Sequence, residues 1–224
     1  MVFFDVGGTL VRRNGDEVRQ VCELLAHLDL AGTPTEVGAA LAAMAHAYHV
    51  GVYAPVSAAG ERGLWRALAT VLLSRLPSGD PALVGRLAEA LGRYTPWYEP
   101  IPDTAAMLAE LRARGLRVGI ISNWLPSLER FLREVGLGSF EVLACSGPLG
   151  LTKPDPAIFR WAVDRAGVPA DEAWYVGNDP NLDYAAARAA GLHAVLWDPE
   201  RRAAADLVRA GTLSELRAAL AAAR

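Results

Sequence analysis

The sequence predicts an α/β fold: a three-layer, Rossmann-like core in which a parallel sheet lies between helices, with an inserted all-helical domain. Two observations predict this fold. Over the second half of the chain, short apolar segments alternate with amphipathic segments, which is the pattern of parallel strands joined by helices. Between the first apolar segment and that alternation lies a long stretch with helical patterning and no convincing strand.

The first element is a short strand at the apolar residues Phe3 and Phe4, which ends in Asp5 and a glycine turn. The helical stretch follows, from about Asp16 to Tyr94, and its helices are marked by capping residues. They are expected after Asp16, Thr35, Ser57 and Asp80, over 17–30, 36–50, 57–76 and 80–93.

Strands and helices alternate again beyond Pro100. A capping box at Thr212 and Glu215 opens the last helix. The other helices are expected over 102–114, 126–135, 154–166 and 181–190, and the strands over 116–121, 140–144, 173–176 and 193–197. We therefore expect a core domain formed by residues 1–14 and 97–224, and a helical domain over 15–96.

Composition restricts the class of partner. Of the 224 residues, 52% are hydrophobic and 21% are charged, which is enough apolar material for a core. A formal charge of -3 argues against a non-specific binder of nucleic acid or membrane surfaces. No apolar run approaches the length of a membrane span, and the first residues lack the basic segment of a signal peptide. We expect a cytoplasmic protein with a small-molecule partner.

The use of basic residues is uneven, with 21 arginines and a single lysine, Lys153. Arginine carries a planar guanidinium, whereas lysine carries a compact ammonium on a flexible stem, so a tight site for one ammonium does not accept arginine. Lys153 therefore becomes a candidate site residue. The alternative is that one surface lysine survives by chance.

Ligands of open parallel sheets bind at the carboxyl ends of the strands. The residues expected there are Asp5, Ser122 with Asn123, Lys153 in a loop, and the segment 177–183. An aspartate can attack phosphorus, while an ammonium and Mg²⁺ neutralise the gathered negative charge. Taken singly, the same residues also suit turns and helix caps. Together, at successive strand ends, they indicate phosphoryl transfer.

The chain resembles the haloacid dehalogenase-like hydrolase superfamily in four motifs. Residues 5–9, Asp-Val-Gly-Gly-Thr, are similar to the family's Asp-x-Asp-Gly-Thr, and residues 119–123 end in its Ser-Asn pair. Residues 153–159 match its Lys-Pro-Asp-Pro-x-Ile-Phe without exception, and residues 177–183 approach its Gly-Asp motif with a second acidic residue. The resemblance covers nearly the whole chain outside the helical stretch.

This resemblance implies a role for each motif. Asp5 would be the nucleophile and Lys153 its cationic partner, while Gly8, Ser122 and Asn123 would bind the substrate. The helical domain would be a cap that closes over the site and selects the substrate. A Mg²⁺ ion would be held by oxygen atoms of Asp5, Gly7, Asn178, Asp179 and Asp183.

Two positions depart from the family pattern. Gly7 stands where family phosphatases carry a second aspartate, the general acid that protonates the leaving alcohol. Asn178 stands where the fourth motif usually has its first aspartate, and an amide oxygen is an uncharged Mg²⁺ ligand. The sequence leaves open whether Asn178 or Asp179 faces the metal.

Three functions fit these residues. The first is a Mg²⁺-dependent phosphatase of a small phosphorylated metabolite that acts through an aspartyl-phosphate on Asp5. The second is a 2-haloacid dehalogenase, which needs no metal, attacks carbon with the same aspartate and typically has tyrosine in place of Gly7. The third is a degenerate member that binds a phosphorylated ligand without turnover.

Overall fold

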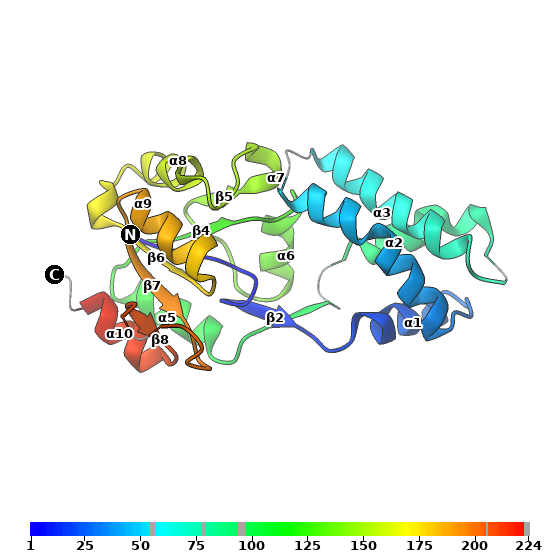
Figure 1. Ribbon diagram of the computed structural model, residues 1–224, viewed down its shortest axis with the longest axis horizontal. Helices are drawn as coiled ribbons and strands as arrows, with labels where there is room; N and C mark the ends of the chain where they lie inside the picture. Colours follow the sequence, from blue (N-terminus) through cyan, green and yellow to red (C-terminus); the bar gives the residue numbers. More distant parts are fainter. Residues whose placement is uncertain (54–56, 78, 94–96, 205, 222–224) are drawn as a thin grey trace.

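The structure is a computed structural model that describes residues 1–53, 57–77, 79–93, 97–204 and 206–221 (Figure 1). Its main sheet has six strands in the order β5-β4-β1-β6-β7-β8, and every neighbouring pair is parallel. Residue Val2 of the central strand β1 pairs with Val118 on one side and Trp174 on the other. The strands are β1 (Val2–Phe4), β4 (Val118–Ser122), β5 (Leu143–Cys145), β6 (Trp174–Gly177), β7 (His193–Trp197) and β8 (Arg209–Ala210).

Helices cover both faces of this sheet, as expected for three layers. Successive residues of a strand point to opposite faces, and β1 shows this directly. Val2 and Phe4 belong to one apolar cluster, while Phe3 belongs to the other. The first cluster includes α5 (Thr104–Ala113), α6 (Leu128–Glu134) and α10 (Leu213–Ala221), and the second includes α8 (Pro156–Ala166) and α9 (Ala186–Ala189).

The stretch expected to be helical forms a helical block with its own apolar cluster, which includes Val21, Leu25, Val37, Leu72 and Leu87. No strand occurs among its described residues between 17 and 91. Figure 1 shows this block beside the core, along the longest axis of the molecule. Its elements are α1 (Glu17–His27), α2 (Pro34–Tyr53), α3 (Ala58–Leu73), the 3₁₀ turn η1 (Pro81–Leu83) and α4 (Val84–Leu91).

Capping explains where these helices begin. The side chain of Asp16 accepts the backbone N–H of Val18, and that of Ser57 accepts the N–H of Gly60. The expected cap at Thr35 is wrong by two residues. Thr33 Oγ1 instead accepts the N–H of Glu36, and the Glu36 carboxylate accepts the N–H of Thr33, which is a reciprocal capping box.

Several short elements were not expected from the sequence. Strands β2 (Val11–Arg13) and β3 (Tyr98–Pro100) pair antiparallel where the chain leaves the core and returns to it, with an ion pair of 2.7 Å between Arg12 and Glu99. The expected end of the helical domain near residue 96 lies outside the described residues. The other unexpected short elements are α7 (Ser146–Leu149), η2 (Ala170–Glu172) and β8. The helix expected over 181–190 consists of the π-helical turn η3 (Pro180–Ala185) and α9.

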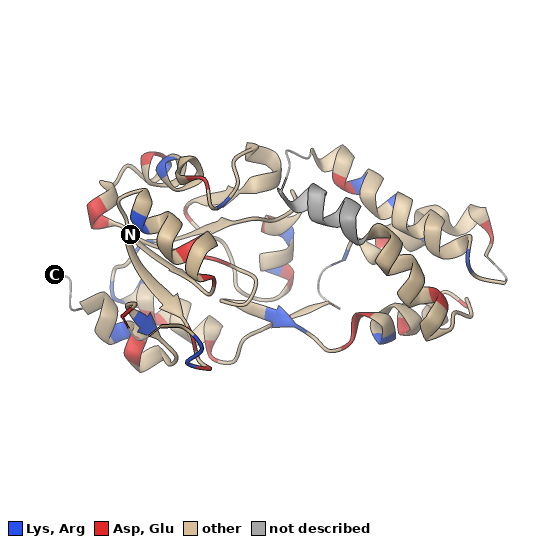
Figure 2. Ribbon diagram, viewed as in Figure 1, with Lys and Arg blue, Asp and Glu red and all other residues tan. Residues whose placement is uncertain are grey.

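Charged residues of both signs are mixed along the outer helices. Figure 2 shows lysine or arginine beside aspartate or glutamate on α6, α8 and α10. On α6 this mixture includes the ion pair between Arg133 and Glu129, at 2.8 Å. Within the described residues, no helix is both long and apolar enough to cross a membrane.

The separate cluster of the helical block gives a stability prediction. Leu72 is fully buried, so Leu72→Ala should lower the free energy of unfolding by about 2–5 kcal/mol through lost burial and a cavity. Val208→Ala, at a side chain that is 49% exposed, should change it by less than about 0.5 kcal/mol. Urea denaturation of both variants measures the difference, and equal effects would contradict the assignment of Leu72 to a core.

Candidate functional site

Four polar side chains meet at the carboxyl ends of the central strands. Asp5 follows β1, Ser122 ends β4, Lys153 lies in the loop after α7, and Asp183 lies in η3 after β6. Ser122 Oγ and Lys153 Nζ each donate a hydrogen bond of 2.8 Å to Asp5 Oδ1. Lys153 Nζ also donates to Asp183 Oδ1 at 2.5 Å. The structure thus brings the predicted Asp5, Ser122, Lys153 and Asp183 into one hydrogen-bonded group.

This group is buried and carries charge. Asp5 is 6% exposed, Lys153 4% and Asp183 1%. Burial raises the pKa of Asp5, an effect that the Lys153 ammonium opposes. For Lys153, burial acts against the charged form, but the carboxylates of Asp5 and Asp183 outweigh it and raise the pKa. Lys153 is therefore a cation at neutral pH, held between two acidic side chains.

Tyr175 is a site residue that the sequence analysis missed. Its hydroxyl accepts a hydrogen bond of 3.0 Å from Lys153 Nζ and lies 2.9 Å from both Asp183 Oδ1 and the carbonyl oxygen of Ile121. Burial, followed by the two nearby carboxylates, raises the pKa of Tyr175 well above its usual value. The sequence feature that could have indicated Tyr175 is its position in an apolar strand. A tyrosine buried there needs a hydrogen-bond partner for its hydroxyl group.

Asn123 holds the main chain of the lysine. Its Nδ2 donates to the Lys153 carbonyl oxygen at 3.0 Å, and its Oδ1 accepts the Lys153 N–H at 2.8 Å. These two bonds join the loop after β4 to the loop that carries Lys153. The structure therefore gives Asn123, expected to bind substrate, a role in positioning the lysine backbone.

Asn178 and Asp179 face different partners. Asn178 Oδ1 accepts a hydrogen bond of 3.3 Å from Thr9, and a Cβ added to Gly8 would lie 2.7 Å from Asn178 Nδ2. Gly8 has a φ of 81°, a left-handed conformation that favours glycine. The carboxylate of Asp179 instead accepts the N–H groups of residues 181 and 182, each at 2.8 Å. Asn178 thus packs on the loop of the first motif, while Asp179 caps η3.

Gly7 lies beside an indole ring. A Cβ added to Gly7 would lie 3.5 Å from Cζ3 of Trp124, which is an ordinary van der Waals contact. Trp124 is 7% exposed and stacks on Phe131 with ring centroids 5.4 Å apart. One further carbon therefore fits at position 7.

The oxygen atoms at this edge can be compared with the needs of Mg²⁺. No three histidine, cysteine or acidic side chains gather around one point among the residues that the structure describes. Asp183 gives Oδ1 to Lys153 and Tyr175, and Oδ2 accepts the N–H of Asp179 at 2.9 Å. Asp179 caps η3, so the predicted ligands besides Asp183 and Asp179 are the Asp5 carboxylate, the Gly7 carbonyl and the Asn178 amide oxygen. This all-oxygen set fits Mg²⁺, which commonly uses one or two carboxylates together with waters and substrate phosphate.

Comparison with known proteins identifies the family of the chain. A family model described as haloacid dehalogenase-like hydrolase matches residues 1–191. A phosphoserine phosphatase from Thermus thermophilus is 39% identical over 145 residues, which cover 62% of this chain and only 58% of that relative. The haloacid dehalogenase-like hydrolase domain-containing protein 3 of Danio rerio is 30% identical over 87% of this chain and 83% of its own length.

A solved structure shows the same fold over nearly the whole length. The 2-haloacid dehalogenase from Pseudomonas syringae pv. Tomato is similar at a TM-score of 0.66 and 25% identity, over 99% of this chain and 97% of that chain. The parallel sheet between helices, with buried acidic side chains and a lysine at its carboxyl edge, defines an α/β protein with a charged strand-end site. The chain belongs to the haloacid dehalogenase-like hydrolase family.

The close approach of Gly177 to Asp183 gives a second prediction. A Cβ added to Gly177 would lie 2.4 Å from Asp183 Cγ, so Gly177→Ala must displace a buried carboxylate that is held by several bonds. We expect the free energy of unfolding to fall by about 1–3 kcal/mol. At Gly63 in α3, nothing lies within 4 Å of the added carbon, so Gly63→Ala should leave stability unchanged or raise it by up to about 1 kcal/mol. Equal effects in urea denaturation would refute the prediction.

Proposed function

We propose that the chain is a phosphatase of a small phosphorylated metabolite and that Asp5 is its nucleophile. The observation that carries this proposal is the buried Asp5 carboxylate, which is hydrogen-bonded through one oxygen to both Ser122 and Lys153. The name of the phosphoserine phosphatase relative supports the choice of phosphorus as the atom attacked.

In this proposal Oδ1 of Asp5 is occupied by its two donors, so Oδ2 attacks phosphorus. A bond forms between Oδ2 and phosphorus as the bond from phosphorus to the leaving oxygen breaks. Water then attacks the aspartyl-phosphate and releases inorganic phosphate and the free carboxylate. Lys153 neutralises negative charge beside the reacting atoms, and Asp183, Tyr175 and Asn123 hold its ammonium and its backbone in place.

Mg²⁺ is part of the proposal. The Asp5 carboxylate, the Gly7 carbonyl and the Asn178 amide oxygen would hold it. Asn178 is favoured over Asp179 because Asn178 lies against Gly8 and Thr9 of the first motif, whereas Asp179 is turned to the N–H groups of η3. The bound ion would neutralise charge on the phosphoryl oxygens. Asp183, which the family resemblance placed among the metal ligands, is assigned here to the lysine because both of its oxygens are hydrogen-bonded.

A 2-haloacid dehalogenase is the second candidate. Two observations favour it: Gly7 offers no side-chain acid, and the fold is similar to a structure of that name. A dehalogenase would attack carbon with Asp5 and release halide, which needs no proton on the leaving group and no metal.

One experiment separates these candidates and the non-catalytic binder. The purified protein is incubated with a panel of phosphorylated metabolites and with 2-chloropropionate, each with Mg²⁺ and with EDTA, while phosphate and chloride release are measured. Phosphate release that requires Mg²⁺ supports the proposal. Chloride release in EDTA selects the dehalogenase, and no release of either selects the binder.

The geometry of Lys153 gives a third prediction. Its Nζ contacts Asp5, Asp183 and Tyr175 within 2.5–3.0 Å at a buried position, and the larger guanidinium does not fit that space. Lys153→Arg should therefore lower kcat about 100-fold, and Asp5→Asn should abolish turnover. A variant Lys153→Arg with the wild-type rate in a steady-state assay would exclude the assigned role of the ammonium.

The absence of a side-chain acid at Gly7 gives a fourth prediction. Without a positioned proton donor, kcat/KM should rise steeply as the pKa of the leaving alcohol falls, because a stable anion departs without a proton. A plot of log kcat/KM against leaving-group pKa for aryl and alkyl phosphates measures this slope. A flat plot would show that another group supplies the proton.

A fifth prediction concerns adding the acid. Gly7→Asp should raise turnover of alkyl phosphates at least about tenfold and leave activated aryl phosphates nearly unchanged. Gly7→Ala is the matched control, since it adds the same Cβ at 3.5 Å from Trp124 without the carboxyl group. If both variants behave alike, the effect comes from the added carbon and not from a proton.

A further inference from the structure

We propose that Glu61 is a positioning residue that holds the helical block against the core and thereby keeps the strand-end site ready for substrate. The kinetic part of this inference rests on the proposed phosphatase function. Its structural part depends only on a contact between α3 and the loop before α6.

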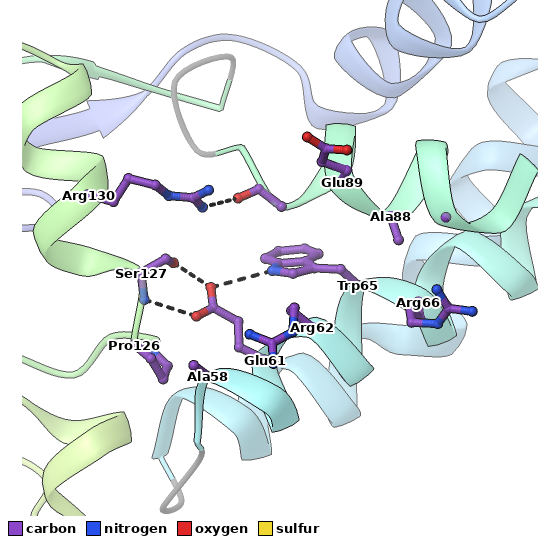
Figure 3. A pocket seen from close by; sticks show the side chains of 12 residues that line it. Ala58, Glu61, Arg62, Trp65, Arg66, Ala88, Glu89, Pro126, Ser127 and Arg130 are labelled. Carbon is purple, nitrogen blue, oxygen red and sulfur yellow. Dashed lines mark hydrogen bonds between the residues drawn. The ribbon is translucent and has the colours of Figure 1, made fainter.

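Glu61 is a buried carboxylate, 5% exposed, on α3 of the helical block. Its Oε2 accepts the backbone N–H of Ser127 at 2.9 Å, and its Oε1 accepts the Ser127 hydroxyl. Trp65 Nε1 donates to the same Oε1 at 3.5 Å. Figure 3 shows the carboxylate pointing across the interface to Ser127 of the core.

The contact replaces a local helix cap. Ser127 stands directly before α6, yet its side chain makes no capping hydrogen bond to that helix. Its hydroxyl and its N–H both go to Glu61, which lies 66 residues earlier in the chain. Both polar groups of Ser127 that donate hydrogen bonds are therefore paired with the helical block and not with α6.

A second bond joins the block to the same core helix. Arg130 of α6 donates through Nη2 to the carbonyl oxygen of Gly92, directly after α4, at 2.9 Å. Between these two bonds lies a cavity of about 550 Å³, and its wall includes Trp65, Arg62 and Glu89 (Figure 3). Apolar packing also joins block and core, because Leu64 and Trp65 of α3 lie against the core cluster, and Glu61 and Arg130 add directed polar bonds to that packing.

Glu61 is connected to the site through a short segment. Ser127 follows Ser122 by five residues, and the segment between them contains Asn123 and Trp124. Asn123 holds the Lys153 backbone, and Trp124 lies beside Gly7. The Glu61 carboxylate therefore holds Ser127 at one end of segment 122–127. At the other end of this segment, Ser122 donates its hydrogen bond to Asp5.

The energetic consequence follows from these hydrogen bonds. Moving the block away from α6 would break the bonds between Glu61 and Ser127 and expose both groups to water. Hydrogen bonds to a charged group contribute net stability even after the loss of hydration is counted, so breaking these two costs free energy. Glu61 thus favours the arrangement in which block and core are in contact. If a ligand binds only this arrangement, its apparent affinity falls in proportion to the fraction of protein molecules that have block and core in contact. Loss of Glu61 lowers that fraction, so it should raise KM more than it lowers kcat.

The test compares four variants. Glu61→Ala removes all of the bonds, and we expect KM for p-nitrophenyl phosphate to rise about tenfold while kcat stays within about twofold. Glu61→Gln keeps an acceptor for the Ser127 N–H and should restore the wild-type KM. Glu89→Ala is the matched control, because Glu89 borders the same cavity and pairs at 3.6 Å with Arg93, which lies in the chain just after the same helix and not in the core. If Glu61→Ala does not fold, Ser127→Ala, which removes the hydroxyl alone, should raise KM about threefold.

Small-angle X-ray scattering of the ligand-free proteins supplies a readout that needs no activity. The radius of gyration should increase for Glu61→Ala and stay unchanged for Glu61→Gln and Glu89→Ala. An unchanged radius, an unchanged KM in a folded Glu61→Ala, or an equal effect of Glu89→Ala would each overturn the inference. If the wild type does not hydrolyse the ester, the proposed function fails, and the radius of gyration alone decides the role of Glu61.

Discussion

The Lys153 ammonium, buried between the carboxylates of Asp5 and Asp183, is the interaction on which the other features of the core depend. A cation at 4% exposure is tolerated only with anionic and hydrogen-bonding partners around it. Those partners come from segments far apart in the sequence. Placing β1 between β4 and β6 brings Asp5 and Ser122 together, and η3 then carries Asp183 to the other side of the lysine.

Glycines make room for this close packing. Gly177 leaves space for the Asp183 carboxylate, and Gly8 leaves space for the Asn178 amide. In both places the missing Cβ lets a polar side chain of the fourth motif approach the backbone more closely than any other residue would allow. The first and fourth motifs therefore interlock, and a change at either glycine acts on the site through steric displacement of its neighbour.

Features set by local patterning could be predicted from the sequence. The alternation of strands and helices, the capping at Asp16 and the strand-end position of Asp5 all follow from neighbouring residues. Features created by distant contacts could not. Three-residue strands such as β2 are too short to show a periodicity. The hydroxyl partners of Tyr175 come from other segments, and the π-helical turn η3 carries Asp183, whose partner Lys153 lies 30 residues earlier. In the sequence, Glu61 has the pattern of a solvent-exposed helix residue, and its contact with Ser127 is evident only in the structure.

Lys153 also determines how the chain responds to amine chemistry. Within these 224 residues it carries the one lysine side chain, and that side chain is enclosed, so the basic groups on the exterior are guanidiniums. Acylating agents and amine cross-linkers meet one lysine side chain, which is shielded, besides the Met1 amine. In a denatured chain the lysine amine becomes reactive, so the extent of its acylation reports how often the chain unfolds. The bias toward arginine thus gives this protein a single lysine whose chemical modification marks the loss of the buried site and needs no mutation to introduce.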